Sequence, residues 1–433
     1  MRAVAAFCEK WDMLPAGGLV LCAVSGGRDS MALLHLLLTM SEQGGFSVAA
    51  AHYNHRLRPT ADRDEAFVRA WCAERNVPFY CGGGDVAAFA AAEGLSVEDA
   101  ARRLRYTFLE GTAAKLGAER IATAHHLQDN AETVLLHLLR GSGLRGLTGI
   151  APVRGRIIRP LLETERAAID AYIEENRIPF VEDETNTDTR YTRNRLRLHL
   201  MPELEELAPG CAGRIAAAAA LLREDEESLE RAAAALLPPA EEDRVSVAVP
   251  LLQKQDPAVA RRLVRLMARQ LGGGLTREQT LAVLELKSGC CLDLGGGLQA
   301  VRKAHRLTIL RLKPPLPPLV LGEGTQNWGP WCITVSRDRP AVPMSASLNP
   351  EKLAGPLTIA PWDGTGRLDV GNGRRTAKRL FADRGIPVEE RFGYPALYMD
   401  GALIALPGVA ADAAFAALEG DALWVSMERR REL

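Results

Sequence analysis

Residues 23–38 have the sequence AVSGGRDSMALLHLLL, and they continue the apolar run GLVLCAV at 18–24. The apolar run predicts a buried strand, and the leucine-rich stretch after the glycines predicts a helix. Gly26 and Gly27 permit backbone angles and a close approach that a Cβ would forbid. Successive amides at the start of a helix form a cradle for an anion. The stretch therefore predicts a strand–loop–helix unit that holds a phosphate group.

The side chains of this loop supply further phosphate ligands. Ser25 and Ser30 offer hydroxyl donors, Arg28 offers a cation, and Asp29 can hold Mg²⁺ against phosphate oxygens. Kinase and GTPase loops of the pattern G-x-x-x-x-G-K-[ST] carry a lysine that grips the β- and γ-phosphates, and this loop has none. Transfer of a γ-phosphoryl group is therefore disfavoured. The simpler alternative is a tight turn with a serine cap.

Bulk composition sets the class of protein. The 433 residues, 47% of them hydrophobic, are typical of two or three globular domains. With 53 basic and 54 acidic residues, any binding of nucleic acid must rely on local basic patches. Eight cysteines without CxxC spacing argue against a zinc ribbon, an iron–sulfur cluster or a disulfide scaffold. With no signal-like or membrane-spanning stretch, we expect a cytoplasmic protein without membrane contact.

Strand and helix signals alternate through the first two hundred residues. Candidate strands lie at 18–25, 46–53, 77–82 and 119–126, and candidate helices lie around 30–41, 62–76, 98–116 and 130–140. This alternation predicts an α/β domain over 1–200 with a doubly wound parallel sheet covered on both faces. Ligands of such sheets bind at the carboxyl ends of the strands. We therefore expect the site at Ser25–Ser30, His52–Arg58 and His125–Glu132.

The remainder of the chain has a different texture. Alanine-rich, charged sequence predicts a mainly helical middle domain over 201–312. The proline-rich segment LKPPLPPLVLGEG begins a stretch, 313–345, that we interpret as an extended linker. A helix at RRTAKRLFADRG and short strands at PALYMDGALIAL predict a small α+β domain over 346–433.

Several motifs carry a resemblance to a known family. SGGRDS resembles the S-G-G-x-D-S signature of the PP-loop in ATP pyrophosphatases, whose fold is adenine-nucleotide α-hydrolase-like. Five further motifs follow in order: AAHYNHRLRP (50–59), SVEDAARRLRY (96–106), TAHHLQDNAETVLLHLLRGSGLRGL (123–147), IIRPLL (157–162) and VEDETNTDTRYTRNRLR (181–197). Together they resemble the tRNA-isoleucine lysidine synthetases of that superfamily. Residues 373–406 are similar to the C-terminal module of the same family.

The resemblance implies a bacterial, cytoplasmic ligase. It would join free L-lysine to C2 of the wobble cytidine in isoleucine tRNA with anticodon CAU, through an adenylated cytidine, and release AMP and pyrophosphate. The lysidine formed would pair with A, so that the tRNA decodes AUA and becomes an isoleucine acceptor. ATP is a substrate and Mg²⁺ the expected metal. Both domains after residue 200 would bind tRNA, and a homodimer is one possible assembly.

Candidate roles can be assigned residue by residue. The catalytic candidates are Asp29, Arg105, His125, Asp129 and Glu132; the ATP-binding candidates are Ser25, Gly26, Gly27, Arg28, Asp29, Ser30, His52 and Asn54; Asp29 is the metal ligand. Asp129 and Glu132, on one helix face, would bind lysine or a second Mg²⁺ and act as base. Arg193, Arg195, Arg197, Arg374, Arg375, Lys378 and Arg379 are the tRNA-binding candidates. For His52 and Asn54, nucleotide contact and loop structure are equal alternatives.

The sequence departs from the family pattern at three places, and rival functions remain to be weighed. Gln128 stands where the family usually has an aspartate, Asn130 where it has a glutamine, and LPG at 406–408 where a tryptophan-containing ending is usual. One rival is another PP-loop enzyme, such as a tRNA thiolase or an amidotransferase-type synthetase, but cysteine pairs and a glutaminase motif are missing. Another is a non-catalytic RNA-binding protein with ATP as a structural ligand. ATP turnover and lysine dependence would separate these alternatives.

Overall fold

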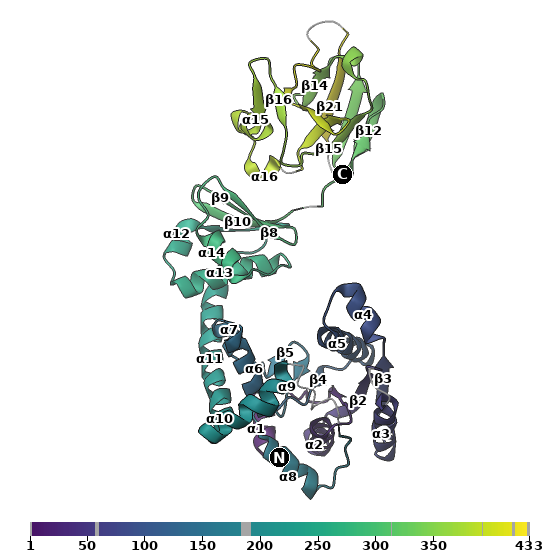
Figure 1. The fold of residues 1–433 in the computed structure, drawn as a ribbon, viewed down its shortest axis with the longest axis vertical. Helices are drawn as coiled ribbons and strands as arrows, with labels where there is room; N and C mark the ends of the chain where they lie inside the picture. The colour runs from purple at the N-terminus through teal and green to yellow at the C-terminus, as the bar shows by residue number, and fades with distance from the viewer. Residues whose placement is uncertain are drawn as a thin grey trace. The chain divides into compact units, whose positions relative to one another are not determined.

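A six-stranded sheet in the order β3-β2-β1-β4-β6-β5 organises the first of two units, Met1–Ser228 (Figure 1). Its strands are β1 (Leu19–Ala23), β2 (Ser47–Asn54), β3 (Phe79–Gly83), β4 (Arg120–Ala122), β5 (Val153–Arg154) and β6 (Ile157–Ile158). All neighbours pair in parallel except β5 and β6, which form an antiparallel hairpin. The predicted parallel α/β sheet is confirmed.

The computed structural model describes residues 2–56, 60–182, 192–312, 314–391, 393–417 and 421–430. Arg58 and most of the motif at 181–197, Arg190 included, therefore lie outside the described residues. Within the described part of the chain, no helix combines the length and apolar character that a membrane crossing requires.

Side chains alternate between the two faces of the sheet, and helices cover both. Val20 and Cys22 of β1 pack with α1 (Arg2–Lys10), α2 (Arg28–Gly44), α3 (Ala61–Glu74) and α8 (Arg166–Glu175). Leu21, which points the other way, packs with α5 (Val97–Leu116), and α4 (Val86–Glu93) lies against α5. The sheet therefore separates α2 from α5, and the ends of its central strands lie between two helical layers.

The loop between β1 and α2 has the conformation that its glycines allow. Gly26 has a φ of +90°, and its carbonyl accepts a hydrogen bond from the amide of Val181 at 2.9 Å. The Ser30 hydroxyl donates to the Gly27 carbonyl at 2.8 Å and accepts from the Ser25 amide at 3.1 Å. Gly27 caps α2 without a side-chain hydrogen bond, so the serine cap of the simpler alternative is not formed. The N-terminus of α2, with its positive partial charge, thus has no side-chain cap and can bind an external anion.

A helical layer completes this unit. It comprises α6 (Leu127–Leu139), α7 (Leu144–Leu147), α9 (Thr192–Arg195), a π-helical turn (Leu196–Leu200), α10 (Met201–Leu207) and, as far as Ser228, α11 (Cys211–Ala234). Leu127 and Ala131 of α6 share a buried cluster with Leu196 and Met201. This cluster fixes the π-helical turn beside α6. π-Helical turns are rare and are frequent at functional sites.

The second unit, Leu229–Leu433, begins with a part that departs from the mainly helical prediction. Its helices are α12 (Val249–Gln253), α13 (Pro257–Gln270) and α14 (Arg277–Leu284). Its four-stranded sheet has the order β7 (Arg244–Ala248), β10 (Arg306–Arg311), β9 (Leu298–Lys303) and β8 (Cys291–Gly295). Three consecutive glycines with positive φ, Gly295–Gly297, turn β8 into β9. The middle segment is therefore mixed α/β, and α10 belongs to the first unit.

The expectation of an extended linker over 313–345 was wrong for residues 319–336. This stretch forms β11 (Leu319–Val320), β12 (Gly324–Trp328) and β13 (Trp331–Ser336). Trp328 and Ile333 are buried in the core of the C-terminal part, and the indole N–H of Trp328 donates to the Pro317 carbonyl at 2.7 Å. Burial of these apolar side chains offsets the entropy of ordering the chain, which a linker cannot do.

The C-terminal part is small and rich in strands, with short helices. It contains β14 (Ser345–Leu348), η3 (Pro350–Lys352), β15 (Leu357–Pro361), β16 (Arg367–Asp369), β17 (Arg374–Thr376), α15 (Ala377–Asp383), α16 (Val388–Arg391), β18 (Pro395–Met399), β19 (Ala402–Leu406), β20 (Ala410–Ala411) and β21 (Leu423–Arg429). One sheet has the order β12-β13-β21-β14 and another β11-β15-β18-β19-β20. The predicted α+β class holds for this part.

Gly26→Ala should destabilise the protein, whereas Gly27→Ala should not. At Gly26 a Cβ would meet the Val68 Cγ2 at 3.3 Å in a backbone with positive φ, a cost of about 1–2 kcal/mol. At Gly27 the nearest atom, the Ser25 Oγ, would lie at an ordinary 3.4 Å. Chemical denaturation of both variants measures the difference. Equal stability of the two variants would contradict this description of the loop.

Candidate active site

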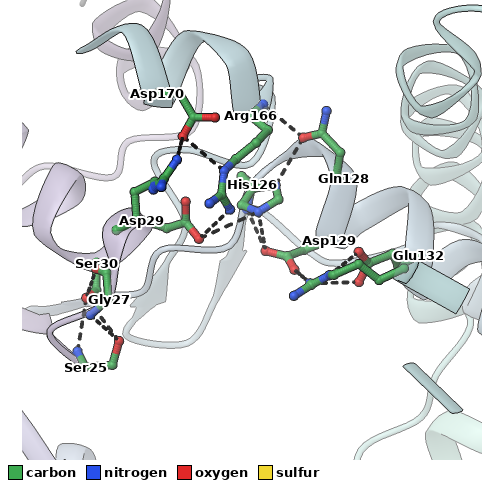
Figure 2. Close-up of polar contacts among 12 residues, drawn as sticks. Ser25, Gly27, Asp29, Ser30, His126, Gln128, Asp129, Glu132, Arg166 and Asp170 are labelled. Carbon is green, nitrogen blue, oxygen red and sulfur yellow. Dashed lines mark hydrogen bonds and ion pairs between the residues drawn. The ribbon is translucent and has the colours of Figure 1, made fainter. Parts of the chain in front are cut away.

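Four side chains of alternating charge lie at the start of α2 and α8. The Arg28 guanidinium donates to the Asp170 carboxylate at 2.9 Å, and the Arg166 guanidinium donates to Asp170 at 3.2 Å and to Asp29 at 3.1 Å. Figure 2 shows Arg166 between the two carboxylates. Arg166 and Asp170 are one helical turn apart, so one face of α8 presents both. The network holds Asp29 at the edge of the phosphate-binding loop.

One oxygen of Asp29 is left without a partner. Its Oδ2 accepts from Arg166, but its Oδ1 is buried and makes no hydrogen bond within the described residues. Burial raises the pKa of Asp29 against the positive charges of His126 and Arg166, which lower it. A buried carboxylate oxygen with no donor fits a cation. The described residues contain no cluster of three or more His, Cys, Asp and Glu side chains that could hold a metal ion.

His126 connects this network to α6. Its Nε2 lies 3.9 Å from the Asp29 Oδ2 and 3.5 Å from the Asp129 Oδ2, and its backbone N–H donates to the same Asp129 oxygen at 3.1 Å. The other ring nitrogen, Nδ1, lies 3.2 Å from the Gln128 Oε1, which also accepts from the Arg166 amide at 3.1 Å. Gln128, the residue that departs from the family pattern, therefore holds His126 and α8 in place.

Asp129 and Glu132 lie on one face of α6, as predicted, and both are buried. Two arginines approach them from the chain beyond residue 191. Arg197 donates to Glu132 at 2.7 and 3.0 Å and to Asp129 at 2.7 Å. Arg193 donates to Glu132 at 3.1 Å and to Asp129 at 3.1 Å. Two buried carboxylates and two guanidinium groups thus form a closed cluster, which we call the carboxylate–arginine cluster.

The charges of this cluster determine how Asp129 ionises. Burial acts to raise the pKa of Asp129, but the positive charges of His126, Arg193 and Arg197 outweigh it and lower the pKa. Asp129 is therefore an anion at neutral pH. Asp29 and Asp129 face the same histidine, but their pKa values move in opposite directions because Asp129 has the larger share of guanidinium contacts.

His125 has surroundings unlike those of His126. Its Nδ1 lies 3.0 Å from the Thr123 hydroxyl, and burial lowers its pKa to about 3. The nearby Asp129 raises the pKa, whereas Arg159 and Arg105 lower it further. His125 is therefore neutral at physiological pH, so it can take part in hydrogen bonds but serves neither as a charged acid nor as an effective base.

His52 and Asn54 make contacts that shape the loop after β2. The His52 ring lies 2.9 Å from the Val24 carbonyl through its Nδ1. The Asn54 amide donates to Asp62 at 2.9 Å and accepts from the Arg56 N–H at 2.9 Å. The alternatives for these two residues were nucleotide contact and a structural role in the loop. Their contacts agree with the structural role, and both side chains are buried.

The basic candidates divide into three groups. Arg193 and Arg197, predicted to contact tRNA, direct their guanidinium groups at carboxylates instead, while Arg195 is exposed. Arg105 is half-buried and lies over the Tyr106 ring, 5.5 Å from its centroid, rather than in the carboxylate–arginine cluster. Arg374, Arg375, Lys378 and Arg379 are exposed on β17 and α15, where Arg375 pairs with Asp383 at 3.2 Å.

Sequence reasoning missed Arg166, Asp170 and the contacts of Gln128. Arg166 and Asp170 stand four residues apart at the start of α8, a spacing that signals an ion pair once the helix is known but not its third partner, Asp29. Gln128 was noted only as a departure from a family pattern. The sequence contains no signal for its bond to the Arg166 amide, because the two residues are 38 positions apart.

A parallel sheet, a glycine loop that leaves the start of α2 uncapped and an adjacent carboxylate define the class as PP-loop nucleotide-binding proteins. The family model for the PP-loop domain accordingly matches residues 4–204, and the model for the TilS substrate C-terminal domain matches residues 357–428.

Similarity to curated relatives identifies the family of the chain within this class. It is 33% identical to the tRNA(Ile)-lysidine synthase of Geobacter sulfurreducens over 93% of this chain and 91% of that one. It is 30% identical to the enzyme of that name from Caldanaerobacter subterraneus subsp. tengcongensis, over 88% and 87% of the two chains. The Thermotoga maritima tRNA(Ile)-lysidine synthase is 44% identical over 46% of this chain and 48% of its own. The chain belongs to the tRNA(Ile)-lysidine synthase family.

His125→Gln should flatten the pH dependence of stability between about pH 6.5 and pH 3. Because the folded pKa is depressed to about 3, the unfolded chain takes up a proton in that range that the folded chain does not. Stability of the wild type therefore falls on acidification, by up to about 1.4 kcal/mol per pH unit. Urea unfolding across the range measures this slope, with His305→Gln, at an exposed histidine, as the control. Parallel curves for wild type and His125→Gln would refute the assignment.

Proposed function

We propose that the protein is an ATP-dependent ligase that joins free L-lysine to C2 of the wobble cytidine of isoleucine tRNA with anticodon CAU. One observation carries the proposal: Nε2 of His126 lies 3.9 Å from the Asp29 carboxylate of the ATP loop and 3.5 Å from Asp129, a candidate amine ligand. A nucleotide activated at the loop is thus adjacent to carboxylates suited to an ammonium group. The membership of the chain in the tRNA(Ile)-lysidine synthase family supports this assignment.

In the first step the C2 oxygen of the cytidine attacks the α-phosphate of ATP, and pyrophosphate leaves. The open N-terminus of α2 and the Ser25 and Ser30 hydroxyls hold the pyrophosphate end. Arg28 and Arg166 stand beside the loop, where their charge can stabilise the negative charge on the leaving group. No lysine is needed in this loop because the γ-phosphate is not transferred.

Mg²⁺ fits this site through Asp29. The partnerless Oδ1 supplies a ligand, and ATP phosphates would supply the others. When bound, the ion neutralises charge that develops on phosphate oxygens. Its charge would also ease the cost of burying the Asp29 carboxylate, which raises the pKa in the metal-free protein.

In the second step the ε-amine of lysine attacks C2 of the adenylated cytidine, and AMP leaves with the former C2 oxygen. Free lysine has a pKa of about 10.4, so it arrives as an ammonium ion that must lose a proton. We assign recognition of this cation to Asp129 and Glu132, and the removal of its proton to one of these two carboxylates.

Lysine must compete with arginine for these carboxylates. Arg193 makes the longer contacts, both 3.1 Å. Arg197 makes contacts as short as 2.7 Å and belongs to the π-helical turn packed on α6. We infer that Arg193 yields its place to the substrate ammonium, while Arg197 keeps the two carboxylates together.

Recognition of the tRNA would use several basic surfaces. Arg195 in the first unit and Arg374, Lys378 and Arg379 in the second are exposed. They suit contacts with backbone phosphates, which position an RNA without reading its sequence. A bacterial cytoplasm supplies tRNA, ATP and lysine together, and we place the reaction there.

Radiolabelled lysine should enter isoleucine tRNA in the presence of ATP and Mg²⁺, and Asp129→Ala should reduce the rate by about 100-fold or more. The carboxylate that receives the ammonium is lost in that variant. The assay uses the full-length protein and transcribed CAU-anticodon isoleucine tRNA, with CAU-anticodon methionine tRNA as the control acceptor. Equal labelling of both tRNAs would contradict the proposed specificity. Release of AMP and pyrophosphate without lysine in the RNA would contradict the proposed acceptor.

Glu132→Gln should separate the two steps. The ATP loop is untouched in this variant, so adenylation proceeds, whereas the ammonium site loses one of its two negative charges. With α-labelled ATP, AMP should accumulate on the tRNA while transfer of lysine falls. Asp29→Asn is the matched control, and it should slow formation of the adenylated tRNA itself. A parallel fall of pyrophosphate release and lysine transfer in Glu132→Gln would count against the division of roles.

A further inference from the structure

A second group of arginines lies on the α5 side of the sheet, apart from the carboxylates. It consists of Arg102 and Arg105 of α5, Arg154 of β5 and Arg159 after β6, arranged around Tyr106. The guanidinium carbons of Arg102, Arg105 and Arg154 lie 5.1, 5.5 and 5.6 Å from the centroid of the Tyr106 ring. We call this group the Tyr106 cage.

The charge of the cage is not balanced by acids. Among the described residues, no carboxylate lies within ion-pair distance of any of its four guanidinium groups. In the same unit, Arg28, Arg166, Arg193 and Arg197 all have carboxylate partners. Clustered like charges repel one another, and a protein gains stability from such a cluster when an external anion binds it.

Two buried polar atoms point to a missing ligand. Arg159 is 3% exposed and Tyr106 is 9% exposed. Within the described residues, neither the Arg159 Nε nor the Tyr106 hydroxyl makes a hydrogen bond of ordinary length and angle, although the hydroxyl faces the guanidinium groups of Arg105 and Arg159. The Nη1 of Arg159 donates to the Ala151 carbonyl. A buried polar atom without a full hydrogen bond costs free energy, so the Arg159 Nε and the Tyr106 hydroxyl, beside the three other arginines, indicate a site built for an anion with several oxygens.

The electrostatics of the cage agree with this interpretation. Burial lowers the pKa of Arg105 and of Arg159, and neighbouring arginines lower each further. Burial acts to raise the pKa of Tyr106, but Arg102 and Arg105 outweigh it and lower the pKa. The phenol thus lies in a strongly positive potential, which an anion would relieve.

The position of the cage suggests which anion it takes. Arg159 follows Ile158, which pairs with Ala122 of β4, and Ala122 pairs with Cys22 of β1. The cage and the ATP loop thus stand two strand spacings apart, about 10 Å, with His125 and His126 between them. The phosphates of ATP would bind at the β1–α2 loop. An RNA nucleotide whose base enters between that loop and the cage would carry its backbone phosphates on the side of the cage. Arg102 and Arg154 are exposed, so a polymer can reach the cage.

We propose that the Tyr106 cage binds a backbone phosphodiester of the RNA substrate beside the target cytidine and so sets how far the base enters the site. This inference rests on the proposed function, because it takes tRNA as the ligand. Arg159 and the Tyr106 hydroxyl would donate to the phosphate from the buried side, and Arg102 and Arg154 would close on it from solvent. The planar guanidinium forks match phosphate oxygens.

Binding of isoleucine tRNA transcript to the full-length protein, measured by fluorescence anisotropy over a range of NaCl, tests the proposal. Arg154→Gln and Arg102→Gln should each weaken binding about tenfold. Each should also reduce the slope of log Kd against log salt by about 0.7–0.9, the loss of one phosphate contact. Arg156→Gln, an exposed arginine in the same β5–β6 hairpin, is the control of equal charge change. Tyr106→Phe should weaken binding about threefold and leave the salt slope unchanged, since it removes a hydrogen bond but no charge.

A second arm measures binding of α,β-methylene-ATP to the same variants, which should be unchanged. If Arg154→Gln weakens the ATP analogue and leaves tRNA binding intact, the cage serves the nucleotide and the proposal is wrong. If Arg154→Gln and Arg102→Gln behave like Arg156→Gln, the cage holds no phosphate. If tRNA binding depends on the cage but no lysine is transferred, the cage proposal stands and the proposed function is refuted. If lysine is transferred but Arg154→Gln and Arg102→Gln bind tRNA as Arg156→Gln does, the proposed function stands and the cage proposal is refuted.

Discussion

Two buried carboxylates on α6 need cations, and that requirement shapes the active site. Asp129 and Glu132 would be costly to bury alone, and Arg193 and Arg197 supply the opposite charge from more than sixty residues along the chain. The contacts tie α9 and the π-helical turn to α6. They also hold Asp129 where His126 can lie between it and Asp29. One electrostatic cluster thereby joins the nucleotide loop to the place proposed for the amine.

Charge is ordered across this unit. Arg28, Asp170, Arg166 and Asp29 alternate beside the ATP loop, the carboxylates of α6 follow, and the arginines of the Tyr106 cage lie beyond β4. In the proposed function each zone would take one reactant: a polyphosphate with its metal, an ammonium ion, and an RNA phosphate. The order of β1, β4 and β6 in the sheet sets the spacing between them. The three proposed sites are thus already arranged in the fold without bound reactants.

Local patterns in the sequence predicted the parallel sheet, the loop at Ser25 and the helix that carries Asp129 and Glu132. They predicted these features because each depends on residues close together in the chain. The partners of Arg193 and Arg197 were not predictable in this way, since a basic run shows its charge but not the carboxylates 61–68 positions away. The strands after residue 318 were missed because prolines at 314–318 outweighed the apolar residues Trp328 and Ile333, whose burial decides the structure.

If the loop directs an acceptor oxygen to the α-phosphate of ATP, that oxygen must end in AMP, and its fate can be followed with an isotope. Isoleucine tRNA carrying ¹⁸O at C2 of the wobble cytidine would be converted with ATP and lysine, and the released AMP analysed by mass spectrometry. The released AMP should carry the ¹⁸O, because the C2 oxygen leaves with the adenylate. Lysine-modified tRNA formed with unlabelled AMP would show that the oxygen never joined the α-phosphate, and it would contradict the account.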